Sequence, residues 1–133
     1  MELFSYTYGD GRTVKADVLP QDSTILEVIF QRDAARFQQD KIRPHLSHPL
    51  REAAMKALPP NLQILRAPGC KIRTWPALPT SIHECYLSHN HYLSVPDLSL
   101  YPNLIVLELD DNSIDEIVNP LPPLLARLNL DCN

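Results

Sequence analysis

Several side chains suited to metal binding lie in the second half of the chain. His83, His89 and His91 occupy one short stretch, and Asp110 and Asp111 follow further along. Imidazole nitrogens and carboxylate oxygens bind zinc or manganese, so a fold that joined the two stretches would form the metal site of a small enzyme or regulator. Such residues also gather by chance on solvated surfaces, and their spacing matches no metal motif. We therefore expect no resident metal or other cofactor, and keep the metal-dependent enzyme or regulator as the alternative.

Motifs for other kinds of catalysis are absent from the sequence. It has no phosphate-binding glycine loop, no GxSxG nucleophile and no HExxH zinc motif. Asp131 precedes Cys132, but no general base is placed to activate a thiol there. Cys70, Cys85 and Cys132 lack CxxC spacing, which argues against a disulfide framework and indicates a compartment where thiols stay reduced. We expect a protein without catalytic activity that works in the cytoplasm.

A repeated apolar pattern organises residues 58–133. Its copies begin 20 to 22 residues apart, at Leu62, Ile82, Leu104 and Leu125. The fourth and sixth positions of every copy are apolar, which indicates a short strand with one buried face. The ninth position holds Cys70, Asn90, Asn112 and Asn133. Asn at this point can satisfy the buried backbone groups that a turn leaves unpaired.

The period and the frame L-x-x-L-x-L-x-x-N/C-x-L resemble a leucine-rich repeat. The turns LPPN, WPALPTS and PLPPL are similar to the short LPX subtype of secreted bacterial effectors that act inside host cells. The resemblance covers three and a half repeats in residues 58–133. It implies an α+β fold in which a solenoid with a curved parallel sheet follows an N-terminal cap. It also implies a non-catalytic protein-binding module, with the cytoplasm of a host cell as one location.

Residues 1–57 are predicted to form this cap. Alternating side chains over residues 1–19 indicate a β-hairpin. Thr24 and Glu27 match a capping box, which predicts a helix from that point, and residues 49–58 predict a second short helix. A hairpin followed by a helix also resembles the opening of a ubiquitin-like β-grasp fold, which implies a ubiquitin-system regulator as a further alternative.

The third, fifth and seventh positions of the repeat strands are predicted to form an exposed concave face. In this arrangement Tyr86 lies between Arg66 and Glu108. An exposed aromatic side chain surrounded by charges is typical of a binding centre, although strand propensity alone also favours Tyr. The predicted partner-binding residues are Arg66, Glu84, Tyr86, Ser88, Val106, Glu108, Asp110, Arg127 and Asn129.

Charge is distributed unevenly along the chain. Residues 1–75 carry 11 Lys and Arg against 8 Asp and Glu, whereas residues 76–133 carry 1 against 8. An acidic surface repels phosphate backbones, so we expect a protein partner with a basic surface and no nucleic acid. The alternative is a solvated face that aids solubility. No apolar stretch is long enough to span a membrane, so no membrane association is expected.

The fourth copy contains its strand without the return segment that should follow. An exposed strand edge beside an open apolar end is a hazard that proteins usually cover. We expect two copies to associate there as a homodimer, unless the chain is a fragment of a longer repeat protein. The predicted self-association residues are Leu125, Leu128, Leu130 and Cys132.

Overall fold

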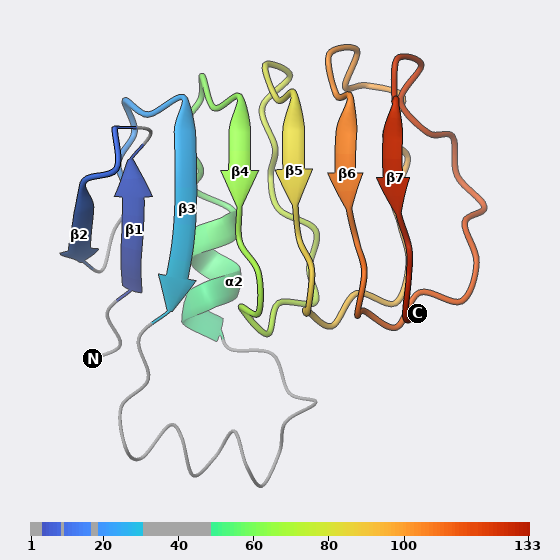
Figure 1. Cartoon of the computed structure of the whole chain (residues 1–133), viewed down its shortest axis with the longest axis horizontal. Coiled ribbons are helices and arrows are strands. Elements are labelled where there is room, and N and C mark those ends of the chain that lie inside the picture. Colours follow the sequence, from blue (N-terminus) through green and yellow to red (C-terminus); the bar gives the residue numbers. More distant parts are fainter. Residues whose placement is uncertain (1–3, 9, 17–18, 31–48) are drawn as a thin grey trace, which may run out of the picture.

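The computed structural model describes residues 4–8, 10–16, 19–30 and 49–133. In these residues seven strands form one sheet, ordered β2-β1-β3-β4-β5-β6-β7, beside one helix, α2 (Figure 1). The described part is thus mostly sheet, with less helix than the predicted α+β fold. The elements are β1 Phe4–Tyr8, β2 Thr13–Ala16, β3 Ile25–Phe30, α2 Pro49–Met55, β4 Ile64–Arg66, β5 Glu84–Tyr86, β6 Val106–Glu108 and β7 Arg127–Asn129.

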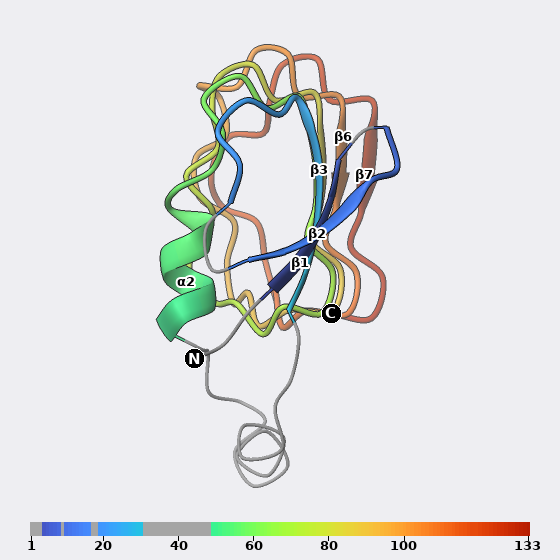
Figure 2. The same cartoon turned by 90° about the vertical axis from the view of Figure 1, so that its left-hand side faces the viewer.

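Strands β3 to β7 run parallel and stack one beside the next. Their register aligns equivalent residues, so Leu65 pairs with Cys85, and Cys85 pairs with Leu107. The chain returns from each strand to the next on the side of the sheet where α2 lies (Figure 2). The architecture is therefore a repeat solenoid with a parallel sheet, as the apolar period predicts.

Apolar side chains on the inner face of the sheet form the core of the solenoid. Burying each large apolar side chain contributes about 1.5 to 3 kcal/mol. In β7 and just after it, Leu128 and Leu130 are only partly buried. The buried first, fourth and sixth positions of the other repeats are Leu62, Leu65, Ala67, Ile82, Cys85, Leu87, Leu104, Leu107 and Leu109.

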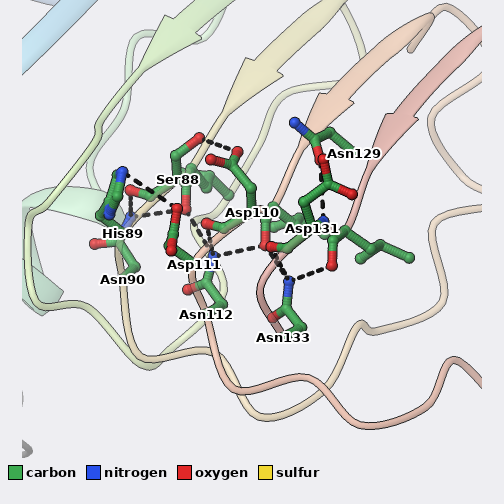
Figure 3. A network of polar contacts seen from close by, with 12 residues as sticks. Ser88, His89, Asn90, Asp110, Asp111, Asn112, Asn129, Asp131 and Asn133 are labelled. Atoms are coloured by element: carbon green, nitrogen blue, oxygen red, sulfur yellow. Dashed lines mark hydrogen bonds and ion pairs between the residues drawn. The ribbon is translucent and has the colours of Figure 1, made fainter.

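Asparagines at the ninth position connect the backbones of neighbouring repeats. Asn90 Nδ2 donates to the carbonyl oxygens of Ala67 and Leu87, each at 3.0 Å, and Asn90 Oδ1 accepts from backbone amides of the preceding repeat. Asn112 and Asn133 make the same pattern in the next two repeats (Figure 3). The predicted role of these asparagines is confirmed.

The residue before each ninth position has a left-handed backbone conformation. The φ angles are 62° at Gly69, 57° at His89, 55° at Asp111 and 58° at Cys132. This conformation costs a non-glycine residue roughly 1 to 2 kcal/mol. Its recurrence in all four repeats shows that the turn requires it, because it directs the ninth side chain back towards the preceding repeat.

The predicted N-terminal hairpin is confirmed. β1 and β2 are antiparallel, with Thr7 opposite Thr13. On its other edge β1 pairs with β3, also antiparallel, and β3 pairs in parallel with β4. The hairpin and the repeats therefore share one continuous sheet, which crosses the predicted boundary between residues 57 and 58.

The helix predicted from Thr24 is wrong, because residues 25–30 form β3. The carbonyl oxygen of Thr24 accepts hydrogen bonds from Gln63 N at 2.7 Å and Ile64 N at 3.0 Å, and Leu26 is fully buried. Pairing with β1 and β4 therefore overrides the local capping signal. The part of the β-grasp resemblance that rests on a helix beginning at Thr24 therefore has a strand in residues 25–30 instead. The part of the predicted helix after residue 30 lies outside the described residues.

The second predicted helix is present but shorter, as α2 ends at Met55. Met55 is 1% exposed and packs into the core. Glu52, in the first turn of α2, accepts a hydrogen bond from Arg73 N at 2.6 Å. The helix is thereby attached to the return segment of the first repeat.

Ser23 offers a direct test of the core. The pairing of Leu26 with Leu65 makes Ser23 equivalent to Leu62, the first position of the first repeat. Later repeats have Leu or Ile at this position, and Ser23 is 6% exposed. Ser23 Oγ is buried and has no hydrogen-bond partner within the described part of the chain. An unsatisfied buried hydroxyl is destabilising, so Ser23→Ala should raise the free energy of unfolding by about 1 kcal/mol in urea titrations. The exposed Ser94→Ala serves as the control, and a destabilised Ser23→Ala variant would contradict the assignment.

Candidate partner-binding face

One row of side chains crosses all seven strands on the face opposite the core. Strand register places its members directly opposite one another, each next in sequence to an inward-facing residue. We call these residues the central row. Its members, in sheet order, are Thr13, Thr7, Glu27, Arg66, Tyr86, Glu108 and Asn129.

Tyr86 lies in the middle of the solenoid part of the central row, as predicted. Its hydroxyl donates to Glu84 Oε1 at 2.5 Å, and the Arg66 guanidinium lies 4.9 Å from the centre of its ring. The hydrogen bond to Glu84 raises the pKa of Tyr86, and partial burial raises it further. The side chain is therefore neutral at physiological pH and held in place on both sides before any partner arrives.

Glu108 differs from its predicted role as a partner contact. Its side chain is only 8% exposed, and its Oε1 lies 2.7 Å from Arg127 Nε, whose side chain is 70% exposed. Glu108 therefore supports Arg127, which presents a cation at the β7 end of the face. The sequence did not reveal this burial because it depends on an arginine from the next strand.

At the carboxyl ends of the strands, polar side chains form a network (Figure 3). Ser88 Oγ donates to Asp110 Oδ1 at 2.5 Å, and His89 Nε2 lies 3.4 Å from Asp111 Oδ2. Asn129 Oδ1 accepts from Asp131 N at 3.0 Å. The network adds three carboxylates to this edge of the face, which we call the acidic edge: Asp110, Asp111 and Asp131.

Only part of the metal-ligand set predicted from the sequence comes together. Ligand atoms of His89, Asp110 and Asp111 all lie within 4.8 Å of one another. His83 lies at the other end of β5, where its Nδ1 is 2.7 Å from the Ser81 carbonyl oxygen. His91 follows the strand, and its backbone amide bonds to the return segment of the first repeat. His89 and Asp111 contact each other directly, and Asp110 accepts a hydrogen bond from Ser88, so each of the three residues has a partner within the protein.

The third positions of the strands form a second row beside the central row. Register places Ile25, Ile64, Glu84, Val106 and Arg127 opposite one another in turn. Ile25, Ile64 and Val106 are each partly exposed. The face thus combines partly exposed aliphatic side chains with charges, a composition that suits protein binding.

Four residues of this face were not predicted from the sequence: Thr7, Thr13, Ile25 and Glu27. Ile25 and Glu27 were missed because β3 was predicted as helix. The signal was present, since Leu26 and Val28 reproduce the apolar fourth and sixth positions of the repeat. Thr7 and Thr13 could not be placed on this face without knowing that the hairpin joins the sheet through the pairing of β1 with β3.

The predicted self-association residues lie at the β7 end of the sheet. Leu125, Leu128 and Leu130 are partly buried, and Cys132 is exposed. Among the described strands, β7 pairs with β6. The homodimer stays a prediction, which the mass from light scattering would test.

Comparison of the chain with protein-family models, curated proteins and solved structures gives no match. None of the described helices has the length and apolar character needed to cross a bilayer. The interpretation of the face therefore depends on its own geometry and charges.

Proposed function

We propose that the chain is a leucine-rich-repeat protein that binds another protein through the face carrying the central row, without catalysis. The repeat period, the parallel stack and the asparagine pattern support the repeat class. We further propose that it acts in the cytoplasm, including that of a host cell. The burial of Cys70 and Cys85 fits a compartment where thiols stay reduced.

The observation that carries this proposal is the setting of Tyr86. An aromatic side chain fixed by Glu84 and Arg66 lies near the middle of a continuous strand face. Fixed aromatic residues dominate protein interfaces because they bury a large area at a small cost in side-chain entropy. The neighbouring aliphatic row and the charges around it would form the remainder of such an interface.

The proposed partner has a basic surface. The acidic edge contributes three carboxylates, and Glu27 and Glu84 contribute two more on the adjoining rows. Arg66 and Arg127 offset part of this charge, and Arg127 is paired with Glu108. Opposite charge on a partner would accelerate association and make the affinity fall as salt increases.

Replacing Tyr86 tests this function. We expect Tyr86→Ala to weaken the complex with a partner captured from a cytosolic extract by about 30-fold, equivalent to about 2 kcal/mol, because the anchor side chain is lost. Calorimetric titration of the purified pair measures the dissociation constant. The free energy of unfolding should change by no more than about 1 kcal/mol, since the side chain is not in the core.

Leu93→Ala is the matched control for this experiment. Leu93 is 60% exposed and lies in a return segment between β5 and β6, away from the central row. The proposal predicts unchanged affinity for this variant. A partner that still binds Tyr86→Ala with unchanged affinity but no longer binds Leu93→Ala would show that another surface is used.

One observation favours the second candidate function, a metal-dependent activity: the proximity of His89, Asp110 and Asp111. That candidate predicts tight retention of zinc or manganese, lost in His89→Ala. The binding function predicts that His89→Ala leaves metal content unchanged. Elemental analysis of both proteins after dialysis decides between the two.

A further inference from the structure

Two adjoining hollows lie where the hairpin meets β3. The first, about 380 Å³, is lined by Tyr8, Asp10 and Arg12 of the hairpin and by the segment from Asp22 to Ile25. The second, about 280 Å³, is lined by Thr7, Gly11, Glu27 and Arg66 and shares Tyr8 and Ile25 with the first. We call the two together the junction pocket.

The junction pocket opens on the partner-binding face. Thr7, Glu27 and Arg66 belong to the central row, and the register places them side by side. β1 and β2 cross the edge of the sheet obliquely, so that the end of the hairpin near the start of β2 lies on the side away from α2 (Figure 2). The hairpin thus forms a wall at one end of the face.

The charges around the pocket are unequally engaged. Arg12 Nε lies 4.0 Å from Asp10 Oδ2, and the Arg12 guanidinium lies 4.1 Å from the centre of the Tyr8 ring. Arg66 stacks on Tyr86. By contrast, Asp22 and Glu27 form no ion pair with any other described residue. The cations lining the pocket are therefore occupied, and two carboxylates remain available.

We propose that the junction pocket receives a basic side chain of the protein partner. This inference rests on the proposed function and specifies one contact within it. The alkyl part of the incoming side chain packs on Ile25, while its charged end reaches the carboxylates of Glu27 and Asp22. Arg12 on Tyr8 shows that a guanidinium group is already accommodated at this surface.

The test uses the intact chain and the tripeptide acetyl-Gly-Arg-Gly-amide, followed by amide chemical shifts in NMR titrations. Saturable shifts are expected at Thr24, Ile25 and Glu27, with a dissociation constant of about 1 mM for so small a ligand. The same peptide with citrulline, which is nearly isosteric with arginine but neutral, should leave these amides unshifted. Equal shifts with citrulline would overturn the proposal, because charge would then play no part.

A double variant, Asp22→Asn with Glu27→Gln, should weaken binding of the arginine peptide at least tenfold. The matched control is Asp115→Asn with Glu116→Gln, two exposed acids between β6 and β7, and it should bind as the unmodified chain does. Shifts confined to the acidic edge, or the absence of saturable shifts, would also overturn the proposal.

The outcomes separate this inference from the proposed function. If Tyr86→Ala loses partner binding and the arginine peptide does not bind at the junction pocket, the proposed binding face is supported and the proposed role of the pocket is wrong. If the arginine peptide binds at the junction pocket and Tyr86→Ala still binds the partner fully, the pocket is supported as a binding site and the proposed role of Tyr86 as the anchor is wrong.

Discussion

Replacing Asn112 with alanine is expected to lower the free energy of unfolding by about 3 to 5 kcal/mol, a large fraction of the stability of a small domain. Asn112 is 9% exposed, and its Nδ2 donates to the carbonyl oxygens of Leu87 at 3.1 Å and Leu109 at 3.0 Å. Its Oδ1 accepts from Tyr92 N at 3.2 Å. Alanine leaves the buried Tyr92 amide without this partner, at a cost of about 1 to 3 kcal/mol. It also removes one hydrogen bond from each carbonyl group, at about 0.5 to 1.5 kcal/mol each, although Leu87 O still accepts from Asn90 and Leu109 O from Asn133.

Denaturant unfolding followed by circular dichroism measures this loss. Asn103→Ala is the control, because Asn103 is exposed just before the same repeat and its replacement should change stability by no more than about 0.5 kcal/mol. Asn112→Asp should also be strongly destabilised, since a carboxylate cannot donate to the two carbonyl groups. If Asn112→Ala lowers the free energy of unfolding by less than about 1 kcal/mol, water replaces the amide group and the hydrogen bonds of Asn112 are not needed for stability.

Raising the pH should destabilise the protein through Cys85. Complete burial raises the pKa of the Cys85 thiol from its ordinary 9.0 to about 12. The folded state therefore favours the protonated thiol, while the unfolded chain ionises at lower pH. The contribution of the Cys85 thiol to the free energy of unfolding is complete below about pH 9 and is lost as the pH rises to about 12. The total loss is roughly 4 kcal/mol.

Urea titrations at several pH values give the free energy of unfolding at each pH, and the slope of this free energy against pH measures the effect. Burial also raises the pKa of Tyr92, and the hydrogen bond between Tyr86 and Glu84 raises the pKa of Tyr86. These tyrosines therefore also make the free energy of unfolding fall as the pH rises. Cys85→Ala removes the cysteine contribution and keeps most of the tyrosine one, because burial is the largest cause of the raised pKa of Tyr92. Cys132→Ala, at an exposed position, should retain the full slope. Equal slopes for Cys85→Ala and the unmodified chain would contradict the burial argument.

The sequence was most informative where structure depends on neighbouring residues or on a repeated period. The strands of the repeats, the role of Asn90 and Asn112, and the N-terminal hairpin were all predicted correctly. β3 was predicted as a helix because Thr24 and Glu27 give a local helix signal, whereas the contacts that make it a strand come from β4, far along the chain. Competition between a local and a distant interaction cannot be decided from the local residues alone.

On the candidate face, too, features set by the repeat pattern were predicted and features set by contacts between distant residues were not. Tyr86 and its neighbours Arg66 and Glu108 were placed correctly on one row, because strand alternation and the repeat period fix their positions. The burial of Glu108 and the junction pocket were not predicted. Both depend on how side chains from separate strands meet, which no periodic pattern encodes.

The asparagine pattern also bears on how the solenoid opens. Each Asn is bonded at once to its own repeat and to the preceding one, as Asn112 is to Leu109 and Leu87. A single turn therefore cannot detach without breaking bonds in its neighbour. Opening is expected to proceed in units of at least two turns, so amides on adjacent repeats should exchange with solvent deuterium together, as one cooperative block.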